Sequence, residues 1–325
     1  MIEWLKQSIQ QQRQFVENTL LQSMGELSRR CARVWLSDEQ LNAVLQDGFA
    51  EITLCDLMYA IDTNGYQRSA NIACSGADPS FMRQNLSERP YLITALPATG
   101  MVLSGVYQNR LTARPCITAL QSVGNANGPL GYIAVDFELR HLPSRVVPEP
   151  DSSEWRQIRG DPAIRGALFT QQHVVSPLDQ HLEGLLPIVE ELICERGIFH
   201  IKIHYSSSRA TLWRIGKPFH YRVHVLDEIL NPSVCLAYPT ALYPDDAVVP
   251  SERVRSILDR FTMLRFIDKT IYLRAASLNV INGMIGLTFS CDGTHYMSFD
   301  EFLDKGVEFW SSGSSEARDS PICSS

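Results

Sequence analysis

The stretch PCITALQSVGNANGPLGYIAVDFEL, residues 115–139, decides the fold of the N-terminal half of this chain. It holds two apolar runs, residues 115–123 and 130–139, rich in the β-branched and aromatic residues typical of strands. Between them lies Asn125–Gly128, a turn sequence. We therefore predict two antiparallel strands that meet at this turn.

Side-chain alternation along the second strand separates its two faces. Tyr132, Ala134 and Asp136 share one face, and the apolar side chains between and after them share the other, against a helix. A carboxylate among apolar neighbours needs a partner. For Asp136 that partner is the ammonium group of a ligand, a salt bridge to Arg89 or Arg114, or a nearby loop that the carboxylate caps.

Strand-like segments upstream extend this hairpin into a sheet. Residues 51–62 and 66–74 flank the turn Thr63–Gly65 and predict a second hairpin. Residues 76–96 predict a loop with a short helical piece, and residues 100–108 a further strand. Together these segments predict a five-stranded antiparallel sheet.

Two helices precede the sheet. Apolar side chains recur at spacings of three, four and seven through residues 2–35, which predicts a long amphipathic helix. Ser37 and Gln40 form a capping box for a second helix that ends near Gly48. The long helix packs along its own sheet, or part of its stripe faces a second copy of the chain in a homodimer. The N-terminal domain is therefore predicted to be α+β.

A proline-rich stretch around Pro148 predicts a linker. We expect a first domain over residues 1–147, a second over 148–310, and a disordered tail over 311–325. The second domain is predicted to be α+β with an antiparallel sheet. Its predicted helices are 178–196 with Pro187 as a possible kink, 252–267 and 298–310, and its predicted strands are 198–206, 210–216, 219–227, 272–279 and 283–291.

Length and composition limit the classes of function. The chain has 325 residues, 45% of them hydrophobic and 20% charged, which is the composition of a globular protein of about two domains. Its net charge of −7 argues against a nucleic-acid partner. We expect a cytoplasmic protein with reduced cysteines, because no membrane span, leader sequence or Cys-x-x-Cys pair is found.

Familiar catalytic and cofactor motifs are missing from the sequence. It contains no phosphate-binding Gly-x-x-x-x-Gly-Lys loop, no Gly-x-Gly-x-x-Gly, no His-Glu-x-x-His and no Gly-x-Ser-x-Gly. We therefore predict no cofactor and no enzymatic activity. A hydrolase whose nucleophile and base converge only in space stays open as an alternative.

Four pieces of the first domain resemble the Cache (PDC) domain, a PAS-like sensor module. They are the D-x-x-G hairpin at Asp62–Gly65, the Ser-x-Arg-Pro-Tyr block at Ser87–Tyr91, the Val-Tyr strand followed by Pro-Cys-Ile, and the ending Gly-Tyr-Ile-Ala-Val-Asp-Phe. Their order and spacing extend the resemblance over roughly residues 1–142. Most members lie outside the membrane between two transmembrane helices, which this chain lacks, so the resemblance implies an intracellular version.

The resemblance implies a ligand site between the sheet and the loop with the Arg-Pro-Tyr block. Arg89 would hold a carboxylate with its guanidinium fork, Tyr91 would add a hydroxyl, and Asp136 would bind an amine. Tyr107 and Thr118 either line this pocket or only pack in the core. The implied function is an intracellular sensor of a small carboxylate or amino-acid-like metabolite.

Such a sensor would pass its signal through the long helix to the second domain, which serves as an output or dimerisation unit, or to a downstream signalling protein. The second domain's helix-then-strand order also allows a divergent PAS-like fold. An alternative function is a PAS-like scaffold that has lost its ligand and mediates dimers or partner docking.

The second domain carries two histidine-rich strands, His200–His204 and His220–His224. Alternation aims the His, Lys and Arg side chains of each strand to one face. They could bind a metal or an anion. The stronger interpretation is a solvated face, with Ile201 and Ile203 of the first strand and Tyr221 and other apolar residues of the second in the core.

Overall fold

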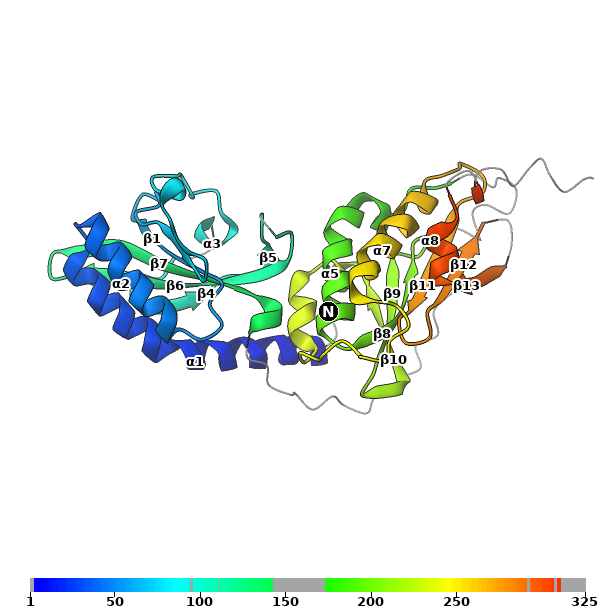
Figure 1. Ribbon diagram of the computed structural model, residues 1–325, viewed down its shortest axis with the longest axis horizontal. Coiled ribbons are helices and arrows are strands. Elements are labelled where there is room, and N and C mark those ends of the chain that lie inside the picture. Colours follow the sequence, from blue (N-terminus) through cyan, green and yellow to red (C-terminus); the bar gives the residue numbers. More distant parts are fainter. Residues whose placement is uncertain are drawn as a thin grey trace, which may run out of the picture. The chain divides into compact units, whose positions relative to one another are not determined.

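The computed structural model describes residues 3–93, 96–110, 112–142, 173–290, 293–306 and 309–310. The chain divides into two compact units: Met1–Pro150 with Asn231–Thr240, and Asp151–Leu230 with Ala241–Ser325. Each unit holds one antiparallel sheet and its own helices (Figure 1). The fold class is therefore α+β with two antiparallel sheets, as predicted.

Helix α1 (Glu3–Val34) and helix α2 (Asp38–Glu51) form the helical layer of the first unit. Buried positions recur on α1 every three or four residues, which confirms the predicted amphipathic stripe. The Ser37 side chain accepts a hydrogen bond of 3.4 Å from the backbone N–H of Gln40, so the predicted N-cap is also confirmed. Helix α2 continues past Gly48, the predicted end, to Glu51.

The first sheet is antiparallel, with the strand order β3-β2-β1-β7-β6-β4 and with β5 also paired to β6. It has seven strands rather than the predicted five, because the expected strand 100–108 splits into two and a short strand β3 extends the first hairpin. The strands are β1 (Leu57–Asp62), β2 (Asn71–Ala73), β3 (Gly76–Asp78), β4 (Met101–Leu103), β5 (Tyr107–Gln108), β6 (Pro115–Asn125) and β7 (Gly128–Glu138).

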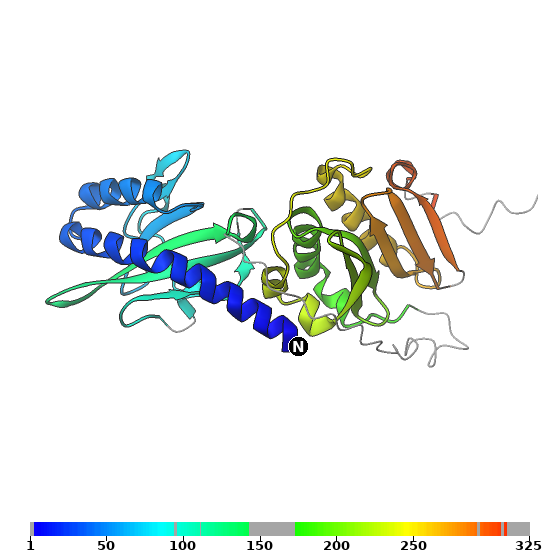
Figure 2. The ribbon, with the colours of Figure 1, turned by 90° about the horizontal axis from the view of Figure 1, so that it is seen from below.

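The two faces of this sheet have different covers. Helices α1 and α2 lie on one side of it, and the short helix α3 (Pro90–Ile93) lies on the other (Figures 1 and 2). The Arg13 guanidinium on α1 donates hydrogen bonds to the backbone carbonyls of Leu103 and Ser104 at 2.8 and 2.7 Å. These bonds fasten α1 to the end of β4.

A segment from the second half of the chain completes the first unit. The 3-10 helix η4 (Pro232–Ala237) belongs to this unit and packs on α1. The rings of Trp4 and Tyr238 meet edge to face, with 6.1 Å between their centres. The buried stripe of α1 is therefore covered inside the chain, and a homodimer through this helix stays a prediction.

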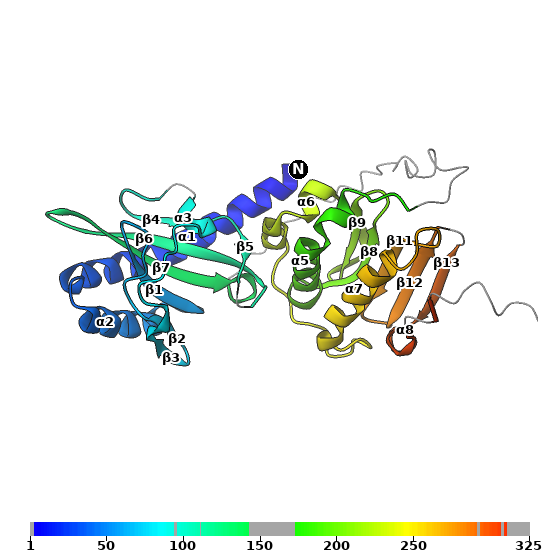
Figure 3. The ribbon, with the colours of Figure 1, turned by 90° about the horizontal axis from the view of Figure 1, so that it is seen from above.

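The second sheet has the order β10-β9-β8-β11-β12-β13, all antiparallel. Helix α5 (Leu182–Glu195) packs on β8, and helix α7 (Ser251–Arg265) packs on β11 and α5 (Figure 3). The other elements are β8 (Ile198–His204), β9 (Arg209–Arg214), β10 (Lys217–Val225), β11 (Leu273–Asn279), β12 (Met284–Phe289), β13 (Thr294–Ser298), α6 (Leu226–Ile229), α8 (Phe299–Asp304), and the 3-10 helices η1 (Pro79–Phe81), η2 (Leu139–His141) and η3 (Leu178–His181).

The strand orders of the two units differ. In the first unit the chain re-enters the sheet at the edge strand β4 and finishes at β7, which lies beside β1. In the second unit it re-enters at β11, beside β8, and finishes at the edge strand β13. The second sheet is thus two consecutive three-stranded meanders, and it does not repeat the strand order of the first.

For strand β10 the prediction is wrong, because it assigned the apolar face to the core and the histidine face to solvent. His224 is fully buried, with its Nδ1 atom 3.2 Å from Oε2 of Glu228, whereas Phe219 and Tyr221 are 95% and 49% exposed. The pairing with β9 shifts register between Lys217 and Tyr221, so alternation does not run unbroken through this strand. On β8 the prediction is confirmed, because Ile201 and Ile203 are buried while the alternating polar side chains of His200, Lys202 and His204 are half-buried.

Three predictions fall on residues outside those that the structure describes. They are the linker, the domain boundary near residue 148 and the tail over 311–325. Among the described helices, none combines the length and the apolar character that crossing a membrane requires.

Candidate functional site

Five polar side chains meet on the face of the first sheet that lies under α3. Four of them are predicted site residues, and the fifth, Tyr59, was not predicted. All five are less than 9% exposed: Tyr59, Tyr91, Tyr107, Thr118 and Asp136.

Strand register places these side chains together. Asp136 on β7 lies opposite Thr118 on β6, and Ala134 on β7 lies opposite Tyr59 on β1. Because side chains two residues apart on a strand share a face, Tyr59, Thr118 and Asp136 all point to the same side. Tyr91 reaches this group from α3, with ring centres 6.5 Å from Tyr59 and 5.8 Å from Tyr107.

One hydrogen-bonded chain ends on the first oxygen of the Asp136 carboxyl group. Thr118 Oγ1 donates to Asp136 Oδ1 at 2.7 Å, and the Tyr107 hydroxyl lies 2.6 Å from Thr118 Oγ1. The single proton of Thr118 is used in its bond to Asp136. Tyr107 therefore donates to Thr118.

A second chain reaches the same carboxyl group through Tyr59. The Tyr59 hydroxyl lies 2.7 Å from the Tyr91 hydroxyl and 3.4 Å from Asp136 Oδ2. A hydroxyl group has one proton, so Tyr59 can donate to Tyr91 or to Asp136 at any moment but not to both. The network thus has two arrangements that differ in which acceptor receives the Tyr59 proton.

Arg89 stands at the outer end of this second chain, one residue before α3. Its guanidinium carbon lies 5.8 Å from the centre of the Tyr91 ring, and the side chain is half-buried. Its Nε atom is buried and has no hydrogen-bond partner among the described residues. A buried N–H without an acceptor is unfavourable, so this donor is suited to an acceptor supplied from outside the chain.

Burial governs the electrostatics of the cluster. It raises the pKa of Asp136 to about 6, although hydrogen bonds from Thr118 and Tyr59 and the charge of Arg89 act in the opposite direction. Burial also raises the pKa of Tyr59 well above its usual range. The partners of Asp136 are thus the hydroxyl groups of Thr118 and Tyr59, and Arg89 acts on its carboxyl group from a longer distance. With a pKa of about 6, this carboxyl group changes its charge about one pH unit below neutral.

Tyr59 was missed because its position depends on which strand lies beside β7. Within the sequence LMYAID, residues 57–62, alternation already puts Leu57, Tyr59 and Ile61 on one face. The missing step was the antiparallel pairing of β1 with β7. A prediction that joined the first and last strands of the sheet would have brought Tyr59 to Asp136.

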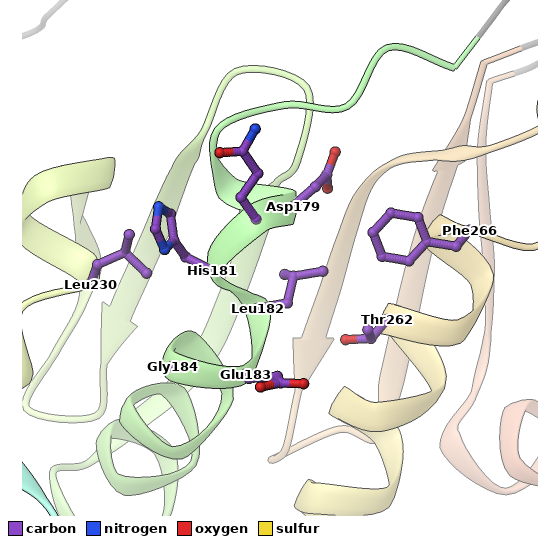
Figure 4. A pocket seen from close by; sticks show the side chains of 9 residues that line it. Asp179, His181, Leu182, Glu183, Gly184, Leu230, Thr262 and Phe266 are labelled. Atoms are coloured by element: carbon purple, nitrogen blue, oxygen red, sulfur yellow. The ribbon is translucent and has the colours of Figure 1, made fainter.

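A separate hollow of about 660 Å³ opens in the second unit (Figure 4). Leu182 and Glu183 of α5 face Thr262 and Phe266 across it. Asp179, which also lines it, accepts two hydrogen bonds of 2.8 and 2.7 Å from the fully buried guanidinium of Arg265. This carboxylate is therefore engaged in holding η3 to α7.

The histidines of the second unit have partners of other kinds. His200 stacks on Trp213 with 4.4 Å between ring centres, and His204 Nε2 lies 3.1 Å from Thr211 Oγ1. Within the described part of the chain, no three His, Cys, Asp or Glu side chains gather as a metal site would require.

Comparison with known proteins gives distant structural similarities. No family model matches the chain, and no curated protein matches it. An extracellular ligand-binding receptor from Desulfohalobium retbaense is 17% identical, with a TM-score of 0.32, over 41% of this chain and 24% of the receptor. The sensory domain of a Campylobacter jejuni chemoreceptor, with isoleucine bound, is 13% identical, with a TM-score of 0.34, over 44% of this chain and 62% of that one.

A Bacillus subtilis protein with an EAL domain, in complex with c-di-GMP and calcium, is 16% identical, with a TM-score of 0.28, over 37% of this chain and 31% of that protein. The chain spans less than two thirds of the length of each of these three proteins. Similarity at this level does not carry function across.

Proposed function

We propose that the first unit is a Cache-type sensor that binds a small carboxylate or amino-acid-like metabolite. The unpartnered, buried Nε–H of Arg89 is the observation that carries this proposal. A carboxylate can accept hydrogen bonds from this N–H and from a neighbouring guanidinium N–H at once. Asp136, with a pKa of about 6, would take the ligand's ammonium group, whose charge favours the ionised carboxyl form.

Signal transmission would follow from the shared proton of Tyr59. A positive ligand group near Asp136 favours the ionised carboxylate, which is the better acceptor for the Tyr59 hydroxyl. Tyr91 then loses its hydrogen bond from Tyr59, which weakens one of the contacts that hold α3 over the sheet. Strand β6, which carries Thr118, packs against α1, so a shift in the population of the two arrangements can reach this helix.

Thermal denaturation against a panel of amino acids and small carboxylates tests the proposal. A compound at 100 times its dissociation constant stabilises the native state by about 2.7 kcal/mol, which raises the melting temperature by several degrees. We expect this shift in the wild type and not in Arg89→Ala. Arg29→Ala, which removes an exposed arginine from α1, is the matched control and should keep the shift.

A ligand-free scaffold is the second candidate function, and one observation favours it. Tyr59, Tyr91 and Asp136 are each 3% exposed or less and are linked by hydrogen bonds to one another, as in a closed core. A scaffold predicts that no compound in the panel shifts the melting temperature. It also predicts that Arg89→Ala leaves the stability of the protein nearly unchanged.

The proposed homodimer through α1 requires the exposed side of that helix, since its buried stripe is covered within the chain. Leu21 on this side is 56% exposed. Sedimentation equilibrium should show a dimer that Leu21→Glu converts to a monomer. A wild-type chain that sediments as a monomer at all concentrations would rule this interface out.

We also propose that the protein works in a reducing compartment. None of the six described cysteines forms a disulfide, and Cys74 among them is exposed. Free exposed thiols persist where glutathione keeps them reduced. Thiol labelling of the protein in intact cells should therefore modify Cys74, and Cys74→Ser should remove that label.

A further inference from the structure

One row of side chains crosses the face of the second sheet that α5 and α7 leave open. Arg209 on β9 lies opposite His204 on β8, and His204 lies opposite Ala275 on β11. Ala275 lies opposite Thr288 on β12, and Thr288 lies opposite Thr294 on β13. A hollow of about 260 Å³ lies over this row, and Lys202, Arg274 and two serines of the turn after β8 also line it.

The lining of this hollow is cationic. Lys202, Arg209 and Arg274 converge on it from three strands, and none of the nine described lining residues is acidic. All three cations are half-buried. None of the ion pairs formed among the described residues includes Lys202 or Arg209. Lys202 and Arg209 are therefore half-buried positive charges without a counter-charge within the described part of the chain, and such charges attract an anion.

Hydroxyl groups complete the lining. Ser206 Oγ is a buried atom that has no hydrogen-bond partner among the described residues. Thr288 and Thr294 hydroxyls are 2.8 Å apart at the opposite end of the hollow. A buried hydroxyl without a partner is unfavourable, so Ser206 is suited to a ligand acceptor.

We propose that this hollow binds the phosphate group of a small phosphorylated ligand. A phosphate monoester offers up to two negative charges and several acceptor oxygens, which match a set of lysine, arginine and hydroxyl donors. The volume is below the roughly 300–1,000 Å³ of pockets that enclose whole drug-sized ligands. It suits the anionic group alone, with the rest of the ligand on the open face of the sheet.

Calorimetric titration of the full chain with inorganic phosphate, at an ionic strength held constant with chloride, tests the proposal. We expect saturable binding in the wild type and at least tenfold weaker binding in Lys202→Gln/Arg209→Gln. The control is Arg253→Gln/Lys269→Gln, which removes the same charge from exposed positions of this unit and should bind like the wild type. If the first double variant does not fold, Lys202→Gln alone should weaken binding at least threefold.

Two further experiments, a titration and a co-sedimentation, distinguish the sources of the phosphate group. Glycerol 3-phosphate that binds at least as tightly as inorganic phosphate indicates a free metabolite. Co-sedimentation with phosphatidylcholine vesicles containing phosphatidic acid, reversed by inorganic phosphate, indicates a lipid headgroup. The proposal is overturned if the wild type shows no saturable binding of phosphate, or if both double variants weaken binding equally, since net charge alone would then explain the effect.

Discussion

At the scale of single residues, the titration of the Asp136 carboxyl group makes the stability of the folded protein depend on pH. An unfolded aspartate has a pKa near 3.9, and in the folded chain burial raises it to about 6. The folded state therefore binds more protons between these two values, and stability falls as pH rises through this window. Well above pH 6, all of the stability that the raised pKa contributes at low pH has been lost. A pKa shift of about two units corresponds to about 3 kcal/mol.

Asp136→Asn should remove this cost, because the amide keeps the shape of the side chain and stays neutral. We expect the variant to gain about 2 kcal/mol of stability relative to the wild type on going from pH 4 to pH 7, because the unfolded aspartate is already about half ionised at pH 4. Urea denaturation of both proteins at the two pH values measures the difference and cancels the contribution of all other groups. Asp245→Asn, at an exposed loop position, should show no such gain. An equal pH response of Asp136→Asn and wild type would contradict the assignment.

The Tyr59 hydroxyl lowers the pKa of Asp136 by its hydrogen bond. Tyr59→Phe should therefore raise the pKa of Asp136 above about 6 and destabilise the protein by about 1–2 kcal/mol, because Tyr91 also loses its hydrogen bond from Tyr59. Carbon-13 NMR of the labelled aspartate carboxyl groups follows the titration directly. Tyr66→Phe, which changes a 45% exposed tyrosine in the same hairpin, is the control. A pKa that stays unchanged in Tyr59→Phe would show that the Tyr91 hydroxyl alone receives the Tyr59 proton.

How far the sequence predicts the site depends on whether a residue's partners lie on its own strand. The need of Asp136 for a partner follows from alternation within β7 alone. The identity of that partner does not, because Thr118 and Tyr59 approach from two neighbouring strands whose register only the sheet defines. Arg89 and Tyr91 are neighbours in sequence, and the resemblance to a known motif implied that both belong to one site, but their contact with each other was not predicted.

At the scale of single elements, Gly131 allows β7 to lie close to β1 and to the Trp35 ring between α1 and α2. A Cβ atom there would overlap the carbonyl oxygen of Ile61 and come within 2.7 Å of the Trp35 ring. Its φ of +156° is also one that other residues rarely adopt.

Gly131→Ala should therefore destabilise the protein by about 3 kcal/mol, because a backbone carbonyl cannot move aside as a side chain can. Chemical denaturation measures the loss. Gly105→Ala, where an added Cβ meets no atom within 4 Å, should change stability by less than about 0.5 kcal/mol. A tolerated Gly131→Ala would mean that β1 and β7 can move apart at this end without loss of the sheet.

Elements with strong local signals were predicted well, and those set by distant pairing were not. The stripe of α1, the Ser37 cap and the turn at Gly65 depend on residues close in sequence, and all three are present. The face of β10 depends on a register shift against β9 and on Glu228, which gives the buried His224 a partner. Side-chain alternation alone reveals neither the register shift nor the partner of His224.

At the scale of the whole molecule, the first unit is built from two separate segments of the sequence. It contains Asn231–Thr240, a segment that follows β10 of the second unit in sequence. The sequence predicts a division into consecutive domains because a linker is read from local composition. A later segment that returns to an earlier unit leaves no local signal, and its apolar residues Val234–Ala237 are those of any buried turn.

A fragment of residues 1–142 should therefore be less stable than the same unit in the intact chain. Without η4, the fully buried Leu5 and its neighbours on α1 lose the cover that Tyr238 and η4 provide. Because a helix end without tertiary packing frays, amides of residues 3–12 should exchange with solvent much faster in the fragment, while those of β6 and β7 change less. Tyr238→Ala in the full chain should shift the same amides in the same direction by a smaller amount. Equal protection of residues 3–12 in fragment and full chain would show that α1 is held by its own sheet alone.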